Sequence, residues 1–459
     1  MYDINIKITI FALNISGSQL SQVKMEISEL YEIFKKHPEI TTDSRNCPEG
    51  SIFFALKGES FNGNAFARSA LEKGCAYAVI DEKEYLCGDS GRMILTDDCL
   101  ETLQQLAAHH RRVLGTKIIG VTGTNGKTTT KELIATVLAK KYNVLYTQGN
   151  FNNHIGVPKT LLRLTKDTEI AVVEMGANHP GEIKKLTSIA APDYGIITNV
   201  GMAHLEGFGS FEGVVHTKGE LYDYLRNNHR GPIFIDANNE HLTGIAGGLE
   251  QIRYGLGRMG EDVTVGGKIT GCRPYLEFAW HRSCGCDHLV RTHLIGSYNV
   301  YNMLAACCIG TYFGVQDLDI CDALAGYVPS NNRSQLEKTE HNSLIVDTYN
   351  ANPTSMMAAL TNFRDMEAEN KMLVLGDMRE LGSASAEEHQ KIVDFIHATK
   401  FENVILVGTE FAGTSHYDYP VYHDVDELID IFKKNRPENK TILIKGSNGI
   451  KLFRLPEIL

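Results

Sequence analysis

The stretch GVTGTNGKTTT, residues 120–130, decides the fold, because it joins an apolar strand to a helix through a glycine-containing turn. In the helix that follows, Leu133, Ile134, Val137 and Leu138 fall on one face, which can dock on a sheet. Such a turn gathers backbone N–H groups and a helix N-terminus around one point, where phosphate is stabilised. The segment therefore predicts a nucleotide-binding loop between a strand and a helix of an α/β domain.

Within this loop the residue types indicate defined tasks. Lys127 can neutralise the β- and γ-phosphate oxygens, and the Thr128 hydroxyl can reach a Mg²⁺ ion. The other predicted nucleotide contacts are Gly123, Thr124, Asn125, Gly126 and Thr129. A glycine-rich turn without a ligand is the alternative, and the complete strand, loop and helix context argues against it.

Three further residues of the same region are candidates by position. Glu174 ends the apolar strand VVE, where it would be a direct or indirect Mg²⁺ ligand or would simply face solvent. His204 lies in a Gly-rich turn after the next strand, and a lone histidine there is more often an ordinary loop residue. Lys218, in HTKGELYDYL, is a lysine on a helix face, and its spacing favours no other role.

Length and composition set the class of protein. A chain of 459 residues is too long for one core, and a prior of about 150 residues per domain predicts about three domains. A hydrophobic content of 43% and a charged content of 22% are typical of a soluble globular protein. The net charge of −11 argues against a broad nucleic-acid-binding surface, so anionic ligands need local donors. No apolar run is long enough to span a bilayer.

The ten cysteines are scattered, which favours a reducing cytoplasm over a disulfide framework. One local cluster comprises His281, Cys284, Cys286 and His288. It lacks the usual spacing of a zinc site, and an exposed turn between strands is the favoured interpretation. We expect a cytoplasmic monomer without a nucleic-acid partner and without membrane insertion.

Pattern and composition divide the chain into three blocks after an N-terminal extension. Residues 1–24 precede an amphipathic helix that begins at a second methionine, and we interpret them as lying outside the first domain. Residues 25–112 alternate short strands and helices, and residues 113–332 predict a mostly parallel, P-loop ATPase-like sheet with added β segments. Residues 333–459 repeat strand and helix four times, which predicts a doubly wound, Rossmann-like sheet. The predicted fold class is therefore α/β in three domains.

Motifs along nearly the whole chain from about residue 25 resemble those of the Mur ligases of peptidoglycan synthesis. They are GVTGTNGKTTTKE, GNFNNHIGVPKTLL, VVEMGANHPGEI, TNVGMAHLEGFGS, TKGE, SYNVYNMLAA and VDTYNANPTSMMAAL, in the order that the family uses. DTYNANP is typical of members that add D-alanyl-D-alanine, whereas members that add the third amino acid carry a DYAHTP type of sequence. The resemblance implies an ATP-dependent ligase that joins D-alanyl-D-alanine to UDP-N-acetylmuramoyl-tripeptide through an acyl phosphate, in cytoplasmic precursor synthesis.

The resemblance also implies roles for residues of the central domain. Lys127 and Thr128 would hold the ATP phosphates and one Mg²⁺ ion, and Glu174 would be a further magnesium ligand. His204 and a Lys218 carbamylated by CO₂ would belong to a second Mg²⁺ site. The carbamate matters because it converts a cation, which would repel the metal, into an anionic oxygen ligand.

Nucleotide and substrate contacts follow from the same resemblance. Asn299 and Asn302, one helical turn apart, would bind the adenine, Arg333 would reach the phosphates, and Asp347 would bind the ribose hydroxyls. Ser44 and Arg45 would bind the uridine diphosphate, for which an arginine fork is suited, although an exposed loop pair is the alternative. The remaining predicted substrate contacts are Asn150 and Asn153, and Asn350 and Asn352 where the dipeptide docks.

The sequence departs from the family pattern at two places. Asn62-Gly63-Asn64 stands where the family has Asp-Gly-His, and Lys445-Gly446-Ser447-Asn448 stands where it has Lys-Gly-Ser-Arg. The second change removes a charge from the third domain, so the group that holds the carboxylate of the dipeptide is left open.

Three alternative functions share parts of these motifs. They are a Mur-type ligase that adds the third amino acid, a folylpolyglutamate synthase and a nucleotide-driven switch ATPase. TYNANP and the TTT after Lys127 argue against the first two. The absence of an NKxD guanine motif, together with a first domain that resembles a uridine site, argues against the switch.

Overall fold

The computed structural model describes residues 25–86, 91–257, 263–283, 285–329 and 335–459. The chain forms two compact units, Met1–His109 and His110–Leu459; the first contains one β-sheet and the second contains two. The predicted extension 1–24 and Arg333 lie outside the described residues. In the described part of the chain, no helix combines the length and the apolar character needed to cross a bilayer.

The first unit is a small α/β domain, as predicted, and its sheet is parallel. Its four-stranded sheet has the order β1-β2-β3-β4, and every neighbouring pair is parallel. The strands are β1 (Ile40–Thr41), β2 (Ile52–Phe54), β3 (Tyr77–Ile80) and β4 (Met93–Leu95). The helices are α1 (Ile27–Phe34), α2 (Ala67–Glu72) and the first part of α3 (Cys99–Leu114), with 3₁₀ turns η2 (Gly63–Phe66) and η3 (Lys83–Tyr85). All three residues of β2 are buried, as expected for a parallel strand covered on both faces.

The central sheet of the second unit has nine strands in the order β13-β12-β11-β10-β9-β8-β5-β7-β6. The strands from β6 to β11 are parallel, and β12 and β13 extend the sheet in antiparallel fashion. Their bounds are β5 (Lys117–Thr122), β6 (Val144–Tyr146), β7 (Ile170–Glu174), β8 (Tyr194–Ile197), β9 (Ile233–Asp236), β10 (Gln251–Leu256), β11 (Val265–Cys272), β12 (Tyr275–Arg282) and β13 (His288–Ile295). The chain leaves β5 toward β6 and returns past it to β8, so the loop after β5 lies at a topological switch point.

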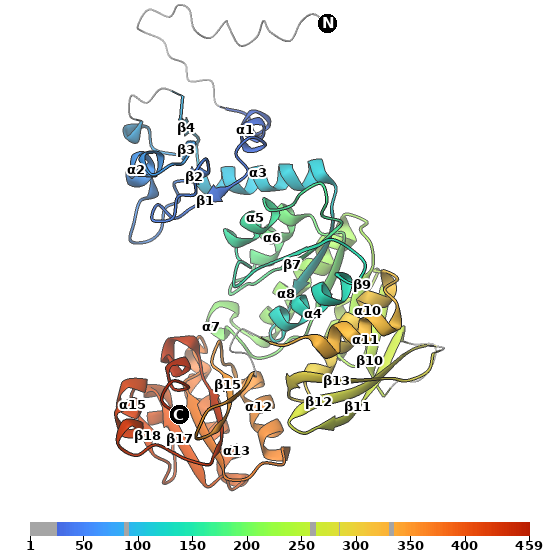
Figure 1. Ribbon diagram of the computed structural model, residues 1–459, viewed down its shortest axis with the longest axis vertical. Coiled ribbons are helices and arrows are strands. Elements are labelled where there is room, and N and C mark those ends of the chain that lie inside the picture. The colour runs from blue at the N-terminus through green and yellow to red at the C-terminus, as the bar shows by residue number, and fades with distance from the viewer. Residues whose placement is uncertain (1–24, 87–90, 258–262, 284, 330–334) are drawn as a thin grey trace, which may run out of the picture. The chain divides into compact units, whose positions relative to one another are not determined.

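Helices cover this sheet and fix the phosphate loop against it. They are α4 (Lys127–Leu138), α5 (Gly156–Leu161), α6 (Glu182–Ala190), α7 (Leu205–Phe208), α8 (Phe211–Asn227), α9 (Glu240–Ile245), α10 (Asn299–Tyr312) and α11 (Asp317–Gly326). The predicted apolar face of α4 is fully buried, and α4 packs against α10 and the strands in one core (Figure 1). The helix that begins the predicted nucleotide site is therefore anchored by apolar burial along its length.

The third sheet, in the same unit, is doubly wound. Its six strands have the order β14-β15-β19-β16-β17-β18, and only the pairing of β14 with β15 is antiparallel among these strands. They are β14 (Gln335–Lys338), β15 (Ser343–Asp347), β16 (Lys371–Gly376), β17 (Asn403–Val407), β18 (Val421–Tyr422) and β19 (Thr441–Lys445). The predicted α/β class in three domains is confirmed, whereas the boundaries at 112 and 332 stay predictions.

Alternate residues of these strands enter two separate cores, because side chains alternate between the faces of a strand. Leu373 and Leu375 of β16 pack in one core with α12 (Pro353–Asp365) and α13 (Ser385–Ala398), and Val374 packs in the other with α15 (Val425–Lys434). Figure 1 shows α12 and α15 flanking this sheet. The short elements α14 (Thr409–Ala412), η4 (Gly382–Ala384), η5 (Asn448–Ile450) and η6 (Leu452–Arg454) complete the domain.

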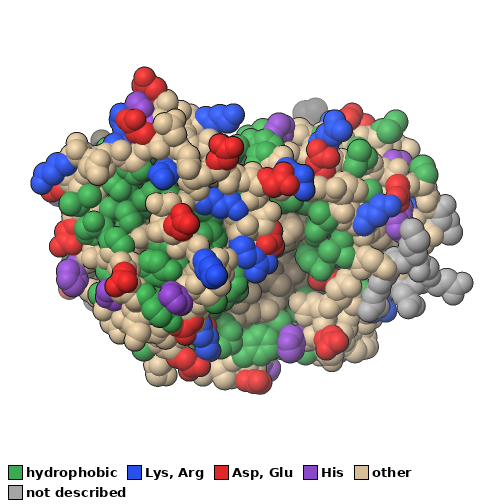
Figure 2. Space-filling view, turned by 90° about the horizontal axis from the view of Figure 1, so that it is seen from below, with side chains coloured by type: hydrophobic (Ala, Val, Ile, Leu, Met, Phe, Trp, Pro, Cys, Tyr) green, Lys and Arg blue, Asp and Glu red, His purple; other side chains and the backbone are tan. Residues whose placement is uncertain are grey.

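Charged side chains are intermixed on the surface seen in Figure 2, where Lys and Arg lie beside Asp and Glu rather than in one basic field. On that face a bound anion would need a specific arrangement of local donors, because mixed charges create no extended positive potential.

Candidate active site

The loop between β5 and α4 has a backbone that only glycine adopts easily. Gly123 has a φ of +143°, and a Cβ on it would lie 2.0 Å from the Thr198 hydroxyl oxygen. Gly126, with a φ of +74°, precedes the first turn of α4. The Lys127 ammonium donates to the carbonyl oxygens of Gly123 at 2.8 Å and Thr124 at 2.9 Å. The lysine thus lies over its own loop, where a phosphate group would enter.

The end of strand β8 holds this loop in shape. The Asn125 N–H donates to the side-chain oxygen of Asn199 at 2.9 Å, and the Asn199 amide donates back to the Asn125 carbonyl at 2.9 Å. The Thr198 hydroxyl donates to the same carbonyl at 2.7 Å. The loop is therefore preorganised, which lowers the entropic cost of binding a ligand.

A buried carboxylate lies beside the loop. The Thr128 hydroxyl donates to one oxygen of Glu174 at 3.2 Å, and the Asn152 amide donates to the same oxygen at 2.8 Å. The other Glu174 oxygen has no hydrogen-bond donor, although the side chain is 1% exposed and the Lys131 ammonium lies 3.8 Å away. A buried oxygen without a donor fits a Mg²⁺ ligand, since this ion takes one or two carboxylates and completes its shell with phosphates and water.

Lys218 is a buried residue of α8. Its ammonium donates to the Ala177 carbonyl at 3.1 Å and lies over the Phe208 ring. Burial lowers the pKa of Lys218 well below its ordinary value, and the positive charge of Lys127 lowers it further. The physical consequence is an amine that is readily deprotonated, a property that the sequence pattern did not indicate.

Asn299 and Asn302 lie next to the loop, at the start of α10. The Asn302 side-chain oxygen accepts from the Thr130 hydroxyl at 3.0 Å, and its amide donates to Asn299 at 2.8 Å. Asn302 also lies against Gly126, where a Cβ would meet it at 2.8 Å. The pair therefore joins α10 to the loop helix, and its contact with an adenine stays a prediction.

The carboxyl edge of the third sheet brings together an ion pair and two asparagines. Asp347, at the end of β15, accepts from the buried Lys445 ammonium at 2.7 Å. Asn350 accepts from the Ala351 N–H at 2.8 Å, and Asn352 caps α12 by accepting from the Ser355 N–H at 2.9 Å. The predicted ribose and dipeptide contacts of these residues stay predictions.

Within the second unit, the third sheet's domain contacts the phosphate loop directly. The Asn352 amide donates to the Asn125 side-chain oxygen at 2.8 Å, and the reverse bond measures 3.4 Å. The Met202 N–H donates to the Thr354 hydroxyl at 3.2 Å. The His204 ring contacts the Glu380 carboxylate, and the hydrogen bond between them lowers the pKa of the Glu380 carboxyl.

Comparison with known proteins places the chain in a family. Residues 38–111, 121–310 and 332–448 match, in that order, models described as Mur ligase family, catalytic domain; Mur ligase middle domain; and Mur ligase, glutamate ligase domain. A UDP-N-acetylmuramoyl-tripeptide–D-alanyl-D-alanine ligase of Bacillus subtilis is 36% identical over 423 residues, which cover 90% of this chain and 91% of the relative. The chain belongs to the Mur ligase family.

Other relatives of this Mur ligase agree with the match. The Escherichia coli protein of the same name is 34% identical, over 89% of this chain and 91% of its own. A crystal structure of MurF from Acinetobacter baumannii superposes with a TM-score of 0.81 at 30% identity, covering 91% of this chain and 92% of that one. MurF of Thermotoga maritima, solved in complex with ADP, superposes with a TM-score of 0.80 at 25% identity, covering 92% and 96%.

In the first unit of this Mur ligase, the predicted uridine-diphosphate residues lie on an exposed loop. Arg45 forms a two-pronged pair with Asp43, at 2.9 and 2.8 Å, and its side chain is 88% exposed. The Ser44 carbonyl accepts from the Lys73 ammonium at 2.7 Å. Arg45 is therefore accessible to a ligand and Ser44 is partly exposed, and the role of both residues stays a prediction.

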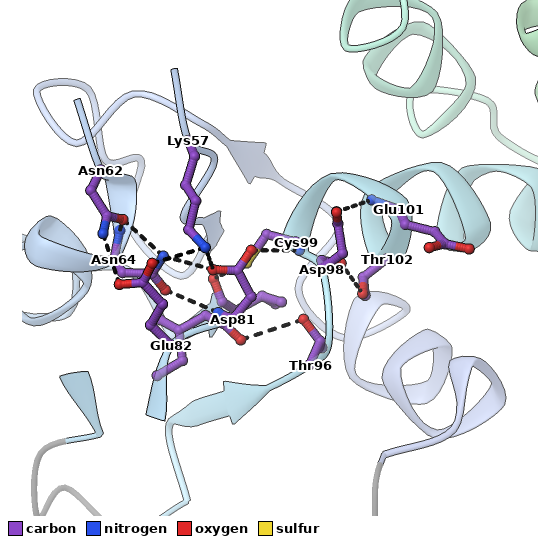
Figure 3. Close-up of polar contacts among 12 residues, drawn as sticks. Lys57, Asn62, Asn64, Asp81, Glu82, Thr96, Asp98, Cys99, Glu101 and Thr102 are labelled. Atoms are coloured by element: carbon purple, nitrogen blue, oxygen red, sulfur yellow. Dashed lines mark hydrogen bonds and ion pairs between the residues drawn. The ribbon is translucent and has the colours of Figure 1, made fainter. Parts of the chain in front are cut away.

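The first family departure, at residues 62–64, forms a closed polar cluster (Figure 3). The Lys57 ammonium lies 2.9 Å from both Asp81 and Glu82. The Asn62 amide donates to Glu82 at 2.8 Å, and the Asn64 amide donates to Asp81 at 2.8 Å. Burial alone would raise the pKa of the Asp81 carboxyl, but hydrogen bonds from Lys57, Asn64 and the backbone N–H of the first residue of α3 lower it. Asn62 and Asn64 thus have a structural role, because their amides hydrogen-bond the two carboxylates of this cluster.

Two contacts were missed in the sequence. Among the asparagines of GNFNNH, Asn152 reaches Glu174 and Asn150 is exposed. The Asn153 side chain accepts from the N–H of Gly156, the first residue of α5, at 2.9 Å. Asn199, in TNVG, orders the phosphate loop. The signal for Asn199 was its place two residues after the end of β8, near the carboxyl ends of the parallel strands, where ligands bind.

The described residues of the His/Cys cluster lie around the connection between β12 and β13: His281 belongs to β12, His288 begins β13, and Cys286 lies between the strands. His288 lies 3.4 Å from Asp317, Cys286 is exposed, and the His281 ring bonds the Arg282 carbonyl at 3.1 Å. Cys284 lies outside the described residues. The two described histidines thus have protein partners of their own.

Proposed function

We propose that this Mur ligase uses ATP to join D-alanyl-D-alanine to the terminal carboxylate of UDP-N-acetylmuramoyl-tripeptide. The observation that carries the proposal is the match, over nine-tenths of the chain, to relatives that bear that activity in their name. The geometry supports it, because the central domain holds a phosphate loop after β5, a buried carboxylate at the end of β7 and a buried lysine of lowered pKa in α8. The proposal places the reaction in the cytoplasm, where nucleotide-activated precursors and ATP occur together.

The first chemical step is the phosphorylation of a carboxylate. A carboxylate is a poor electrophile, so its oxygen attacks the γ-phosphate of ATP, ADP leaves, and an acyl phosphate forms. Lys127 would move from its loop carbonyls onto the phosphate oxygens and neutralise the developing charge. Thr128 and the free oxygen of Glu174 would hold one Mg²⁺, which supplies charge neutralisation at the phosphates when bound.

A second Mg²⁺ requires an anionic group near Lys218, and a carbamate on this lysine supplies one. Carbamylation needs a neutral amine, because the nitrogen lone pair attacks CO₂ and the nitrogen loses a proton. The lowered pKa of Lys218 supports this modification, since it raises the neutral fraction of the amine near pH 7. His204, at the turn before α7, would complete the second site.

The second step is amide formation. The free amine of D-alanyl-D-alanine attacks the acyl carbon, a tetrahedral intermediate forms, and inorganic phosphate leaves. Acyl phosphates hydrolyse, so water must be excluded while the intermediate exists. The Asn125–Asn352 pair supports such a closed state, because it joins the phosphate loop to the first turn of α12.

The proposal is tested by measuring phosphate release and the mass of the product. We expect ATP turnover to require both UDP-N-acetylmuramoyl-tripeptide and D-alanyl-D-alanine, with tripeptides ending in L-lysine or diaminopimelate offered separately. Equal turnover without either substrate would favour a switch ATPase. A product that contains one added lysine or diaminopimelate on a dipeptide precursor would favour the neighbouring ligase instead.

The carbamate has its own test. Lys218→Ala should abolish turnover, because it removes the anionic ligand of the second ion, and a short-chain carboxylic acid that fills the space should restore part of it. Lys185→Ala, on the exposed face of α6, is the matched control. Failure of every acid to restore turnover would leave the second ion without this ligand.

A further inference from the structure

The loop after β16 carries Arg379, whose guanidinium lies beside Gly449, the residue next to the second departure from the family pattern at Asn448. Arg379 follows β16, and the segment Gly446 to Asn448 follows β19, which pairs with β16 in parallel. Both loops therefore emerge at the carboxyl edge of the sheet, where ligands of doubly wound folds bind. A Cβ on Gly449 would lie 2.9 Å from the central guanidinium carbon of Arg379, so the guanidinium lies directly over the residue next to Asn448.

The backbone around Arg379 is fixed from three sides. The Arg379 N–H donates to the Ser447 hydroxyl at 2.9 Å, and the Ser447 N–H donates to the Asp377 carbonyl at 3.1 Å. The Met378 N–H donates to the buried His389 ring at 3.0 Å. These bonds bind the two loops together and hold the base of the arginine in place, so little freedom is lost when the guanidinium binds a ligand.

The positive charge of Arg379 is free to bind an anionic ligand, whereas that of Lys445 is already paired with Asp347. Arg379 is exposed, and no acidic side chain among the described residues pairs with it. Lys445 is buried and neutralised by Asp347 at 2.7 Å. The next residue, Glu380, contacts His204, so the loop reaches the predicted chemistry of the central sheet.

We infer that Arg379 binds the terminal carboxylate of the incoming dipeptide, in place of the arginine that Asn448 replaces. The guanidinium fork offers two parallel N–H donors to a carboxylate. This assignment rests on the proposed function, because it presumes a peptide with a free carboxylate as the second substrate. It also makes Arg379 a specificity residue, since a nucleophile without the carboxylate loses the pair.

The test compares D-alanyl-D-alanine with D-alanyl-D-alaninamide, which has the same amine and no carboxylate. In the full-length protein, Arg379→Met should raise the KM for the dipeptide by about 10- to 100-fold, as expected for the loss of a charge-assisted pair, with a smaller change in kcat. The KM for the amide and for ATP should change less than twofold. Arg379→Lys should retain part of the affinity, and Asn448→Arg in the Arg379→Met background should restore it.

Arg436→Met is the matched control, because Arg436 lies before β19, toward the opposite edge of the sheet. An unchanged KM for the dipeptide in Arg379→Met would overturn the assignment. An equal rise in the KM for D-alanyl-D-alaninamide would overturn it as well, because the substitution would then act on the structure and not on the carboxylate. If the unmodified protein releases no phosphate in response to D-alanyl-D-alanine, the proposed function itself fails, and this result is distinct from both.

Discussion

At the residue scale, the chemistry depends on how burial alters single groups. Lys127, Lys131 and Lys218 are all lysines of the central domain, but their surroundings differ. Lys127 rests on loop carbonyls, Lys131 is buried 3.8 Å from Glu174, and Lys218 is buried without a carboxylate in hydrogen-bond contact. For Lys218, burial lowers the pKa because desolvation penalises the ammonium, and this effect outweighs the opposing charges of Glu182 and Glu220.

Asp81 gives a prediction for pH dependence. Its pKa is lowered in the folded state, so its ionised form adds stability above the unfolded value of about 4, and this stability is lost as pH falls through the folded value. Asp81→Asn should therefore lower the free energy of unfolding by about 1–3 kcal/mol at pH 7, and the difference should shrink below about pH 4. Urea unfolding, monitored by hydrogen exchange of the amides in β2 and β3, measures this difference in the free energy of unfolding at pH 7 and below about pH 4.

Glu84 provides the control for Asp81, because it lies on the same unit and is exposed. Glu84→Gln should change the free energy of unfolding by less than about 0.5 kcal/mol at either pH. A difference for Asp81→Asn that grows as the pH falls would contradict the assigned direction of the shift.

At the scale of the element, the phosphate loop depends on backbone conformations that side chains prevent. Gly123→Ala should abolish detectable ADP binding, because its Cβ would meet Thr198 at 2.0 Å and the φ of +143° is strained by about 1–3 kcal/mol for alanine. Calorimetric titration with ADP and thermal unfolding measure the two effects. Gly247→Ala, where no heavy atom lies within 4 Å, should change neither. ADP binding of normal strength in Gly123→Ala would show that the loop tolerates a different conformation.

The helices around the loop were predictable because each carries its own local signal. The apolar face of α4 was read from periodicity and is buried as predicted, since a helix with one apolar stripe must cover it. The residues that cap the helices were harder to predict from the sequence. Asn352 begins α12 with a capping box that closes on Ser355, but the same amide also reaches another domain.

At the scale of the whole second unit, the Asn125–Asn352 pair is one of the polar contacts that join the two domains. Asn352→Ser should lower kcat/KM by about 3- to 10-fold, because serine still caps α12 but cannot reach Asn125. Asn352→Ala should also lower the melting temperature, since the cap is worth about 1 kcal/mol. Steady-state kinetics and thermal unfolding separate these contributions.

Asp424 offers a matched control, because it caps α15 through the N–H groups of Asp426 and Glu427. Asp424→Ser exchanges a cap in the same domain and should leave kcat/KM within twofold of the unmodified protein. An unchanged kcat/KM in Asn352→Ser would mean that the Asn125–Asn352 pair does not contribute to turnover.

The sequence by itself determined the phosphate loop, the α/β class and the order of the domains. Each of these rests on neighbouring residues: a glycine turn before a helix, or an apolar strand before a polar turn. The buried strand ending in Glu174 was predicted in the same way, because strand period and strand end are local properties.

Only the tertiary structure decided which polar groups meet. Asn125 and Asn352 are separated by 227 positions, and Arg379 meets Gly449 across two strands that are not consecutive. Asn152 rather than Asn150 or Asn153 faces Glu174, because the direction of each side chain depends on a loop that the sheet positions. The burial that lowers the pKa of Lys218 is likewise a property of packed elements, since a helix-face lysine has the same local sequence whether water or another helix covers it.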